Sequence, residues 1–139
     1  QISTGINLPL KGNIFISVKD KDKPFIINFS KNLISLGFTL ICTKGTGNFL
    51  IGEGLKISFV NKAREGRPHI VDMIKNKDIV LIFNTTEGNQ SISDSFSLRQ
   101  AALHTNIPYY TTISGCNAAV MALETLIKSE LRIKSLQSY

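Results

Sequence analysis

The sequence has no apolar run close to the roughly 20 residues that a membrane-spanning helix needs. Its first residues also lack the charged, apolar and small-residue segments of a signal peptide. The 2 cysteines, Cys42 and Cys116, lie far apart and outside any C-x-x-C spacing, so we expect neither a zinc cage nor a disulfide framework. We interpret both as small buried apolar residues, and we take the cytoplasm as the default compartment.

The chain has neither an internal repeat nor a low-complexity tract. Its 139 residues, 42% hydrophobic and 19% charged, suit one folded domain and exclude a disordered or fibrous class. The opening stretch, QISTGINLPLKG, combines Gly, Pro and polar residues without periodicity. We therefore expect a linker over residues 1–11 and a domain over residues 12–139. Because the chain begins with such a linker and without Met, we expect it to be a piece of a longer protein.

The formal net charge of +6 and the pI of about 9.5 raise the question of a nucleic-acid partner. Basic residues gather around residues 19–23 and in the C-terminal tail, but aromatic residues that could stack on bases are not interleaved with them. Net charge alone speaks to association and solubility rather than to fold. We expect neither a nucleic acid nor a membrane as a partner.

Short apolar runs rich in β-formers alternate with segments of helical periodicity, which is typical of a parallel sheet with helices on both faces. The fold class that we predict is α/β, a three-layer α/β/α domain with a five-stranded, mainly parallel central sheet. The predicted strands are NIFISV (13–18), FTLICT (38–43), KISFV (56–60), DIVLIF (78–83) and PYYTT (108–112).

The connections between these runs predict helices. Phe25, Phe29 and Leu33 recur every four residues and form one apolar helix face, and Gly37 is a C-cap. Shorter helices are predicted over about 46–53 and 69–77. Two more follow: one capped by Ser93 or Asp94 and running to about His104, and one from about Asn117 with a buried stripe of Ala119, Ala122, Leu123, Leu126 and Ile127.

Polar residues follow nearly every predicted strand. In an open parallel sheet, ligands bind at the carboxyl ends of the strands, where loops and helix N-termini converge. Threonine hydroxyls, backbone N–H groups and lysines there would favour an anionic or phosphorylated ligand, and Gly45 would let the backbone approach it closely. The residues concerned are Lys19, Lys21 and Lys23 after the first strand, Thr43, Lys44 and Thr46 after the second, Asn61 and Lys62 after the third, Asn84, Thr85 and Thr86 after the fourth, and Thr111 and Thr112 after the fifth.

Several longer strings carry a family resemblance. They are TKGTGNFL (43–50), VNKAREGRPHIVDMIKN (60–76), NTTEG (84–88), SDSFSLRQAAL (93–103) and IPYYTTISG (107–115). Together they resemble the C-terminal allosteric domain of the large subunit of carbamoyl phosphate synthase, a domain with the fold of methylglyoxal synthase. The segment STGINLP before it is similar to the junction with the preceding ATP-grasp domain.

The resemblance implies a regulatory domain rather than an enzyme. The parent enzyme would be an ATP-dependent ligase that makes carbamoyl phosphate from glutamine, bicarbonate and two ATP with Mg or Mn, for pyrimidine and arginine biosynthesis. Expected partners are a nucleotide monophosphate of the UMP or IMP type, with ornithine as a further effector, the rest of the large subunit and the small glutaminase subunit. We expect the parent to be oligomeric and this domain to hold no cofactor.

The effector pocket of the family can be carried over residue by residue. Thr111 matches a threonine associated with ornithine. In two places the sequence departs from the family pattern: Lys44 replaces a frequent histidine, and Asn89 and Gln90 replace a pair of arginines. The expected effector-binding residues are Lys23, Thr43, Lys44, Thr46, Lys62, Asn84, Thr85 and Thr86.

Two alternatives stay open beside the regulatory domain. A methylglyoxal synthase-type lyase acting on dihydroxyacetone phosphate needs a carboxylate base and a histidine, but their positions match Arg67 and Ser91. Arginine is always protonated and cannot be that base. A free-standing nucleotide-binding module is the second alternative. His69, beside a predicted helix start, is interpreted as structural rather than functional.

Overall fold

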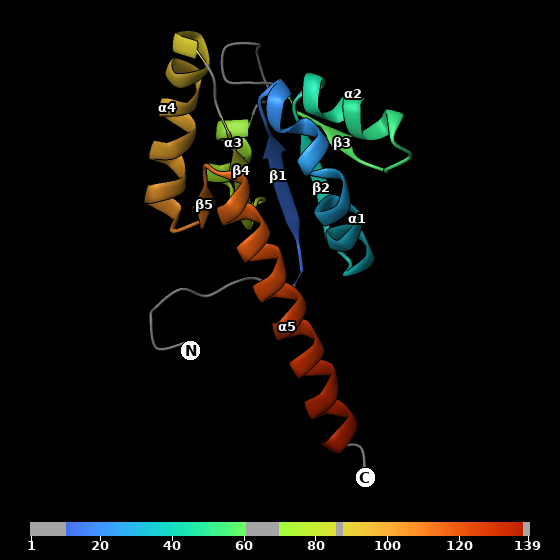
Figure 1. Cartoon of the computed structure of the whole chain (residues 1–139). Helices are drawn as coiled ribbons and strands as arrows, with labels where there is room; N and C mark the ends of the chain where they lie inside the picture. Colours follow the sequence, from blue (N-terminus) through green and yellow to red (C-terminus); the bar gives the residue numbers. More distant parts are fainter. Residues whose placement is uncertain (1–10, 61–69, 86–87, 138–139) are drawn as a thin grey trace.

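A parallel sheet forms the middle of the molecule (Figure 1). The computed structural model describes residues 11–60, 70–85 and 88–137, without the side chains of 88–94 and 131–137. The sheet has five strands in the order β3-β2-β1-β4-β5, and all four strand pairs are parallel. This confirms the predicted fold class. The strands are β1 (Asn13–Ser17), β2 (Thr39–Cys42), β3 (Ser58–Phe59), β4 (Leu81–Asn84) and β5 (Tyr109–Tyr110).

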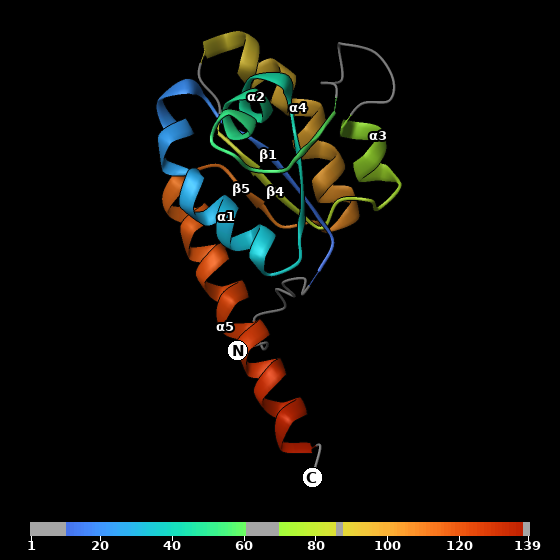
Figure 2. The ribbon, with the colours of Figure 1, turned by 90° about the vertical axis from the view of Figure 1, so that its right-hand side faces the viewer.

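Helices cover both faces of the sheet (Figure 2). One face packs on α1, α2 and α5, around side chains such as Phe29, Leu50 and Leu123. The other face packs on α3 and α4, around Ile74 and Leu98. The helices are the 3₁₀ helix η2 (Asp20–Phe25), α1 (Ile27–Ser35), α2 (Lys44–Gly52), α3 (Ile70–Lys75), α4 (Gly88–Thr105) and α5 (Ile113–Gln137).

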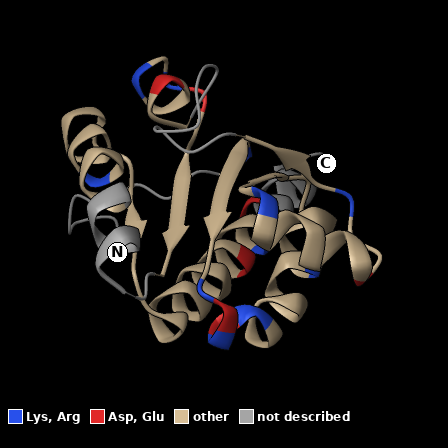
Figure 3. Ribbon diagram, turned by 90° about the horizontal axis from the view of Figure 1, so that it is seen from above, with Lys and Arg blue, Asp and Glu red and all other residues tan. Residues whose placement is uncertain are grey.

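The distribution of apolar and charged side chains along the sequence explains why the sheet lies between layers of helices. The five strands carry no charged residue, and Ile14 of β1, Leu40 of β2 and Leu81 of β4 are fully buried. Figure 3 shows Lys, Arg, Asp and Glu on helices and loops rather than on strands. Strands that are buried on both faces are mostly apolar, which is why β1, β2 and β4 are recognisable as short apolar runs.

The predicted helix boundaries are wrong in three places. Phe25 is not on the apolar face of the first helix but lies in η2 and is 63% exposed. The 3₁₀ turn around Pro24 advances about 120° per residue and so shifts the helical phase before α1 begins. α4 begins at Gly88 instead of after Ser93 or Asp94. α5 begins at Ile113 instead of Asn117, because the Thr112 hydroxyl caps it by accepting the Gly115 N–H at 3.0 Å.

The helices α1, α2, α3 and α4 end in the same way, with a residue of positive φ directly after the last turn. After α1, the Phe38 N–H donates to Leu33 O at 3.1 Å and the Gly37 N–H to Ile34 O at 3.0 Å, a Schellman pair with Gly37 at φ 103°. This confirms Gly37 as the predicted C-cap. The corresponding positive-φ residues after the other three helices are Gly54 (α2), Lys77 (α3) and Asn106 (α4).

α5 runs from the carboxyl edge of the sheet past its opposite end, where its C-terminal part extends beyond the other elements (Figures 1 and 2). Of the predicted stripe, Ala119 and Leu123 are buried and Ile127 packs against the core. Within the described residues, no helix is long and apolar enough to cross a membrane.

Candidate functional site at the carboxyl edge of the sheet

The carboxyl ends of β1, β2 and β4 lie side by side, because β1 pairs with both neighbours in parallel. Register places Ile16 of β1 beside Cys42, and Ser17 beside Asn84. The segments that leave these three strands therefore meet at one edge. They are η2 after β1, the first turn of α2 after β2, and Thr85 after β4.

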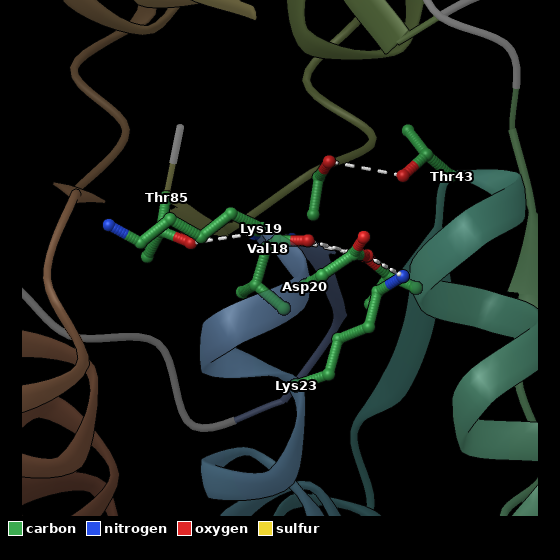
Figure 4. A network of polar contacts seen from close by, with 8 residues as sticks. Val18, Lys19, Asp20, Lys23, Thr43 and Thr85 are labelled. Atoms are coloured by element: carbon green, nitrogen blue, oxygen red, sulfur yellow. Dashed lines mark hydrogen bonds and ion pairs between the residues drawn. The ribbon is translucent and has the colours of Figure 1, made fainter. Parts of the chain in front are cut away.

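The backbone that leaves β1 is fastened on both sides by predicted effector residues (Figure 4). The Thr46 hydroxyl accepts the Val18 N–H at 3.0 Å, and its oxygen lies 3.4 Å from Val18 O. The Thr85 hydroxyl accepts the next N–H, that of Lys19, at 3.0 Å. Both threonines are buried, so consecutive amides of the loop that leads into η2 are held from α2 and from the end of β4.

Thr43, the N-cap residue of α2, does not cap its own helix with its side chain. Its hydroxyl pairs instead with the hydroxyl of Ser17, at 3.0 Å. The first N–H groups of a helix have no partner within the helix. In α2 these groups belong to Lys44, Gly45 and Thr46, and the first helical bond there runs from the Gly47 N–H to Thr43 O at 2.8 Å.

Lys23 reaches from η2 to this first turn of α2. Its ammonium Nζ lies 3.4 Å from the position that a Cβ on Gly45 would take. The same Nζ donates a hydrogen bond of 2.6 Å to Oδ1 of Asp20. The side chain of Lys23 is only 18% exposed, whereas that of Asp20 is 92% exposed. The hydrogen bond from Lys23, with its charge, lowers the pKa of Asp20.

A second cluster at the edge holds Asn84. Its Nδ2 donates to the hydroxyl of Ser95 in α4 at 2.9 Å and to the hydroxyl of Tyr109 in β5 at 2.7 Å. The guanidinium of Arg99 lies 5.2 Å from the centre of the Tyr109 ring. Sequence reasoning missed Ser95, Arg99 and Tyr109. Their signal was their place in the motif strings, since each lies in a string that also carries the family resemblance.

Of the remaining predicted residues, the structure describes two, Lys44 and Thr111, and neither takes part in the contacts given above. Lys44 is exposed on α2. Thr111 is exposed after β5, which is an edge strand and is separated from β1 by β4. Lys62 and Thr86 lie outside the described residues, as do Arg67, His69 and the side chain of Ser91. The structure thus brings together Lys23, Thr43, Thr46 and Thr85 around the loop after β1, with Asn84 at the adjoining strand end.

The cysteines are the buried apolar residues that the sequence predicts. Cys42 at the end of β2 and Cys116 in α5 are free and 0% exposed. Burial raises the pKa of each thiol to about 12, in Cys116 with a further contribution from the charge of Asp22. Neither thiol is a nucleophile at neutral pH, because only the thiolate reacts.

Fold and edge together define a three-layer α/β/α domain with a polar rim at its strand ends, and comparisons with known proteins place it more closely. The model of the MGS-like domain matches residues 25–111. Because this match covers more than half of the sequence, the chain belongs to the MGS-like domain family. A solved structure of methylglyoxal synthase from Elizabethkingia anophelis NUHP1 superposes with a TM-score of 0.65, over 81% of this chain and 79% of that chain, at 15% identity. Similarity at that identity supports the fold alone.

Relatives with identities well above 15% are carbamoyl phosphate synthase large chains. This chain is similar to the carbamoyl phosphate synthase large chain of Myxococcus xanthus (strain DK1622), with 48% identity over 139 residues, 100% of this chain and 13% of the relative. It is also similar to the carbamoyl phosphate synthase large chain of Rhizobium meliloti (strain 1021), with 43% identity over 139 residues, 100% of this chain and 12% of that relative. The chain thus spans only 12–13% of the length of these relatives.

Proposed function

We propose that this chain is the regulatory domain of a carbamoyl phosphate synthase large chain and that it binds a phosphorylated nucleotide at the carboxyl edge of the sheet. The identity to the carbamoyl phosphate synthase large chains over the full 139 residues supports the parent enzyme. The observation that supports the ligand is the position of the Lys23 ammonium over Gly45, beside the first turn of α2.

A phosphate suits that position for two reasons. The first turn of α2 offers backbone N–H groups without a side-chain cap, and the helix dipole adds positive potential there. Lys23 adds a full charge that is only partly exposed, so solvent screens it less than a surface lysine. Gly45 has no Cβ to hold the ligand away from the backbone.

The finer parts of the proposal follow from the family resemblance. The effector is of the UMP or IMP type, and Lys62, Asn84 and Thr86 complete its pocket. Ornithine acts near Thr111. The parent is a glutamine-hydrolysing ligase of the cytoplasm that uses ATP with Mg or Mn for pyrimidine and arginine biosynthesis, with a small glutaminase subunit as its partner.

The effector would control the parent by binding two arrangements of this domain with different affinity. Such a difference is typically about 1–3 kcal/mol, and it sets the largest shift that the effector can cause. A lyase acting on dihydroxyacetone phosphate is the less favoured function, because the position of the required base holds Arg67.

Calorimetric titration of the chain with UMP, IMP and dihydroxyacetone phosphate tests the proposal. We expect a nucleotide to bind and dihydroxyacetone phosphate to yield no methylglyoxal. Lys23→Ala should weaken nucleotide binding by about 1.5–3 kcal/mol, because it removes a charge-assisted hydrogen bond. Lys21→Ala is the matched control, since Lys21 is an exposed lysine of the same 3₁₀ helix.

Three results decide between the functions. Equal losses in the two variants would show that only net charge matters and would remove Lys23 from the site. Methylglyoxal production would replace the regulatory domain by an enzyme. Binding of neither nucleotide would overturn the proposed effector class.

A further inference from the structure

The 3₁₀ helix η2 contains a carboxylate at the point where the proposed phosphate would sit. Asp20 accepts a hydrogen bond of 2.6 Å from Lys23 Nζ, and Figure 4 shows that ammonium between Asp20 and the start of α2. The two side chains differ in exposure, because Asp20 is 92% exposed and Lys23 is 18% exposed. The lysine is therefore the fixed member of the pair, and the aspartate is the member that solvent or a ligand can replace.

Electrostatics explains why a carboxylate stands there. An ammonium close to the N-terminus of a helix meets the positive end of the helix dipole and needs a negative neighbour. Asp20 supplies that neighbour in this structure. A phosphate monoester, with a charge of about −1.5 to −2 and three acceptor oxygens, would meet the same need more fully.

Both anions cannot use Lys23 at once without cost. Two like charges about 4 Å apart repel each other, and the repulsion grows where the surroundings exclude water. We propose that Asp20 is an internal competitor of the phosphate, so that a nucleotide must displace the Asp20 carboxylate from Lys23 in order to bind. This inference rests on the proposed function and assigns to Asp20 the setting of the affinity of that site.

Another role for Asp20 would be stabilisation of η2 through an ion pair between residues i and i+3. An ion pair with a partner as exposed as Asp20 contributes little to stability, so we expect the contact to add little to the stability of the fold. A neighbouring pair provides the comparison, since Lys19 Nζ and Asp22 Oδ2 lie 4.0 Å apart in the same segment. Figure 4 shows the Lys19 side chain pointing away from Lys23, toward Thr85.

Titration of variants with UMP, IMP and inorganic phosphate at fixed ionic strength tests the competition. Asp20→Asn should bind the nucleotide about five-fold more tightly, the factor expected when one exposed ion pair no longer has to be broken. Asp22→Asn is the control matched in charge: it changes the net charge by the same amount at a less exposed position of the same 3₁₀ helix, and its gain should be under about two-fold. Thermal unfolding of each variant checks the fold, with Asp20→Ser as a second substitution.

The gain should also depend on Lys23. In the Lys23→Ala background, Asp20→Asn should change the affinity by less than about two-fold, because the competed ammonium is gone. Equal gains in Asp20→Asn and Asp22→Asn, a gain that persists without Lys23, or weaker binding in Asp20→Asn would each overturn the competition while leaving the proposed function intact. A wild type and an Asp20→Asn variant that both fail to bind any of the three probes would overturn the proposed function itself.

Discussion

The carboxyl edge of the sheet and the middle of α1 both bury hydroxyl groups, but the two regions differ in whether these hydroxyls have hydrogen-bond partners. At the edge, Thr43, Thr46 and Thr85 are at most 5% exposed, and each hydroxyl has a hydrogen-bond partner in β1 or in the two residues that follow it. In α1, Ser30 is 0% exposed, and among the described residues its hydroxyl has no partner. Burial of a polar group costs free energy unless a hydrogen bond compensates it.

The presence or absence of hydrogen-bond partners distinguishes an organised polar site from an isolated polar residue in a hydrophobic core. Two of the threonines at the edge hold the consecutive backbone amides of Val18 and Lys19, just before the 3₁₀ helix η2 that carries Asp20 and Lys23, so they help to fix the position of the proposed anion site. Ser30 lies on the buried part of α1 with Phe29 and Leu33, and among the described residues its hydroxyl does not hydrogen-bond to any group. We therefore expect substitutions at the two places to change stability in opposite directions.

The largest effect is expected at Thr46. Thr46→Val keeps the shape but removes the oxygen that accepts the Val18 N–H, a buried hydrogen bond of 3.0 Å. An unsatisfied buried amide costs about 1–3 kcal/mol, so the free energy of unfolding should fall by about 2 kcal/mol in urea titration. Thr46→Ser retains the hydroxyl and should lose less. An unchanged midpoint in Thr46→Val would mean that the loop after β1 does not depend on this bond.

Ser30 should respond with the opposite sign. Ser30→Ala removes a buried hydroxyl without a partner and improves helix propensity, so the free energy of unfolding should rise by about 1 kcal/mol. Chemical denaturation measures the change. Ser30→Thr is the control, because it keeps the hydroxyl and adds a methyl group in a fully buried place, which should destabilise the domain. A loss of stability in Ser30→Ala would contradict the interpretation of Ser30 as unpaired.

Much of the fold could be predicted from the sequence because the determining patterns are local. Strands buried on both faces are apolar runs, and NIFISV and DIVLIF carry that pattern in consecutive residues. Gly37 could be recognised as a helix end because the left-handed backbone conformation that ends many helices is most easily adopted by glycine. Lys77 takes the same role after α3 with a positive φ of 64°, and no local preference of lysine predicts it.

The start of α4 shows where local preference fails. Gly88, Asn89 and Ser91 are poor helix formers, so the sequence favours a later start near Ser93, yet the helix already includes them. Packing of α4 along α3, through side chains such as Leu98 and Ala102, belongs to the tertiary structure. It is not visible in the residues of the first turn.

The candidate site divides in the same way. Polar residues after the strands predict which segments meet, because parallel strands end at one edge. They do not predict which atoms a hydroxyl reaches. Thr46 and Val18 are 28 positions apart, and Thr85 and Lys19 are 66 apart, so these bonds exist only once the sheet has formed. The contacts of Asn84 with Ser95 and Tyr109 are likewise set by the positions of β4, α4 and β5.

The smallest net effect is expected from a pair of substitutions at the Ser17–Thr43 contact. Here a hydroxyl bonds to another hydroxyl at 3.0 Å, so neither side holds a backbone group. Ser17→Ala or Thr43→Val alone leaves a part-buried hydroxyl unpaired and should cost about 1 kcal/mol. The double variant removes both partners and should lie within about 0.5 kcal/mol of the wild type, because apolar groups of similar shape replace a matched pair. Losses that simply add, measured as a double-mutant cycle in urea, would show that the two hydroxyls stabilise the edge through other contacts. A near-zero double effect beside a large loss in Thr46→Val would mean that the edge depends on hydroxyls bonded to the backbone, rather than on polarity in general.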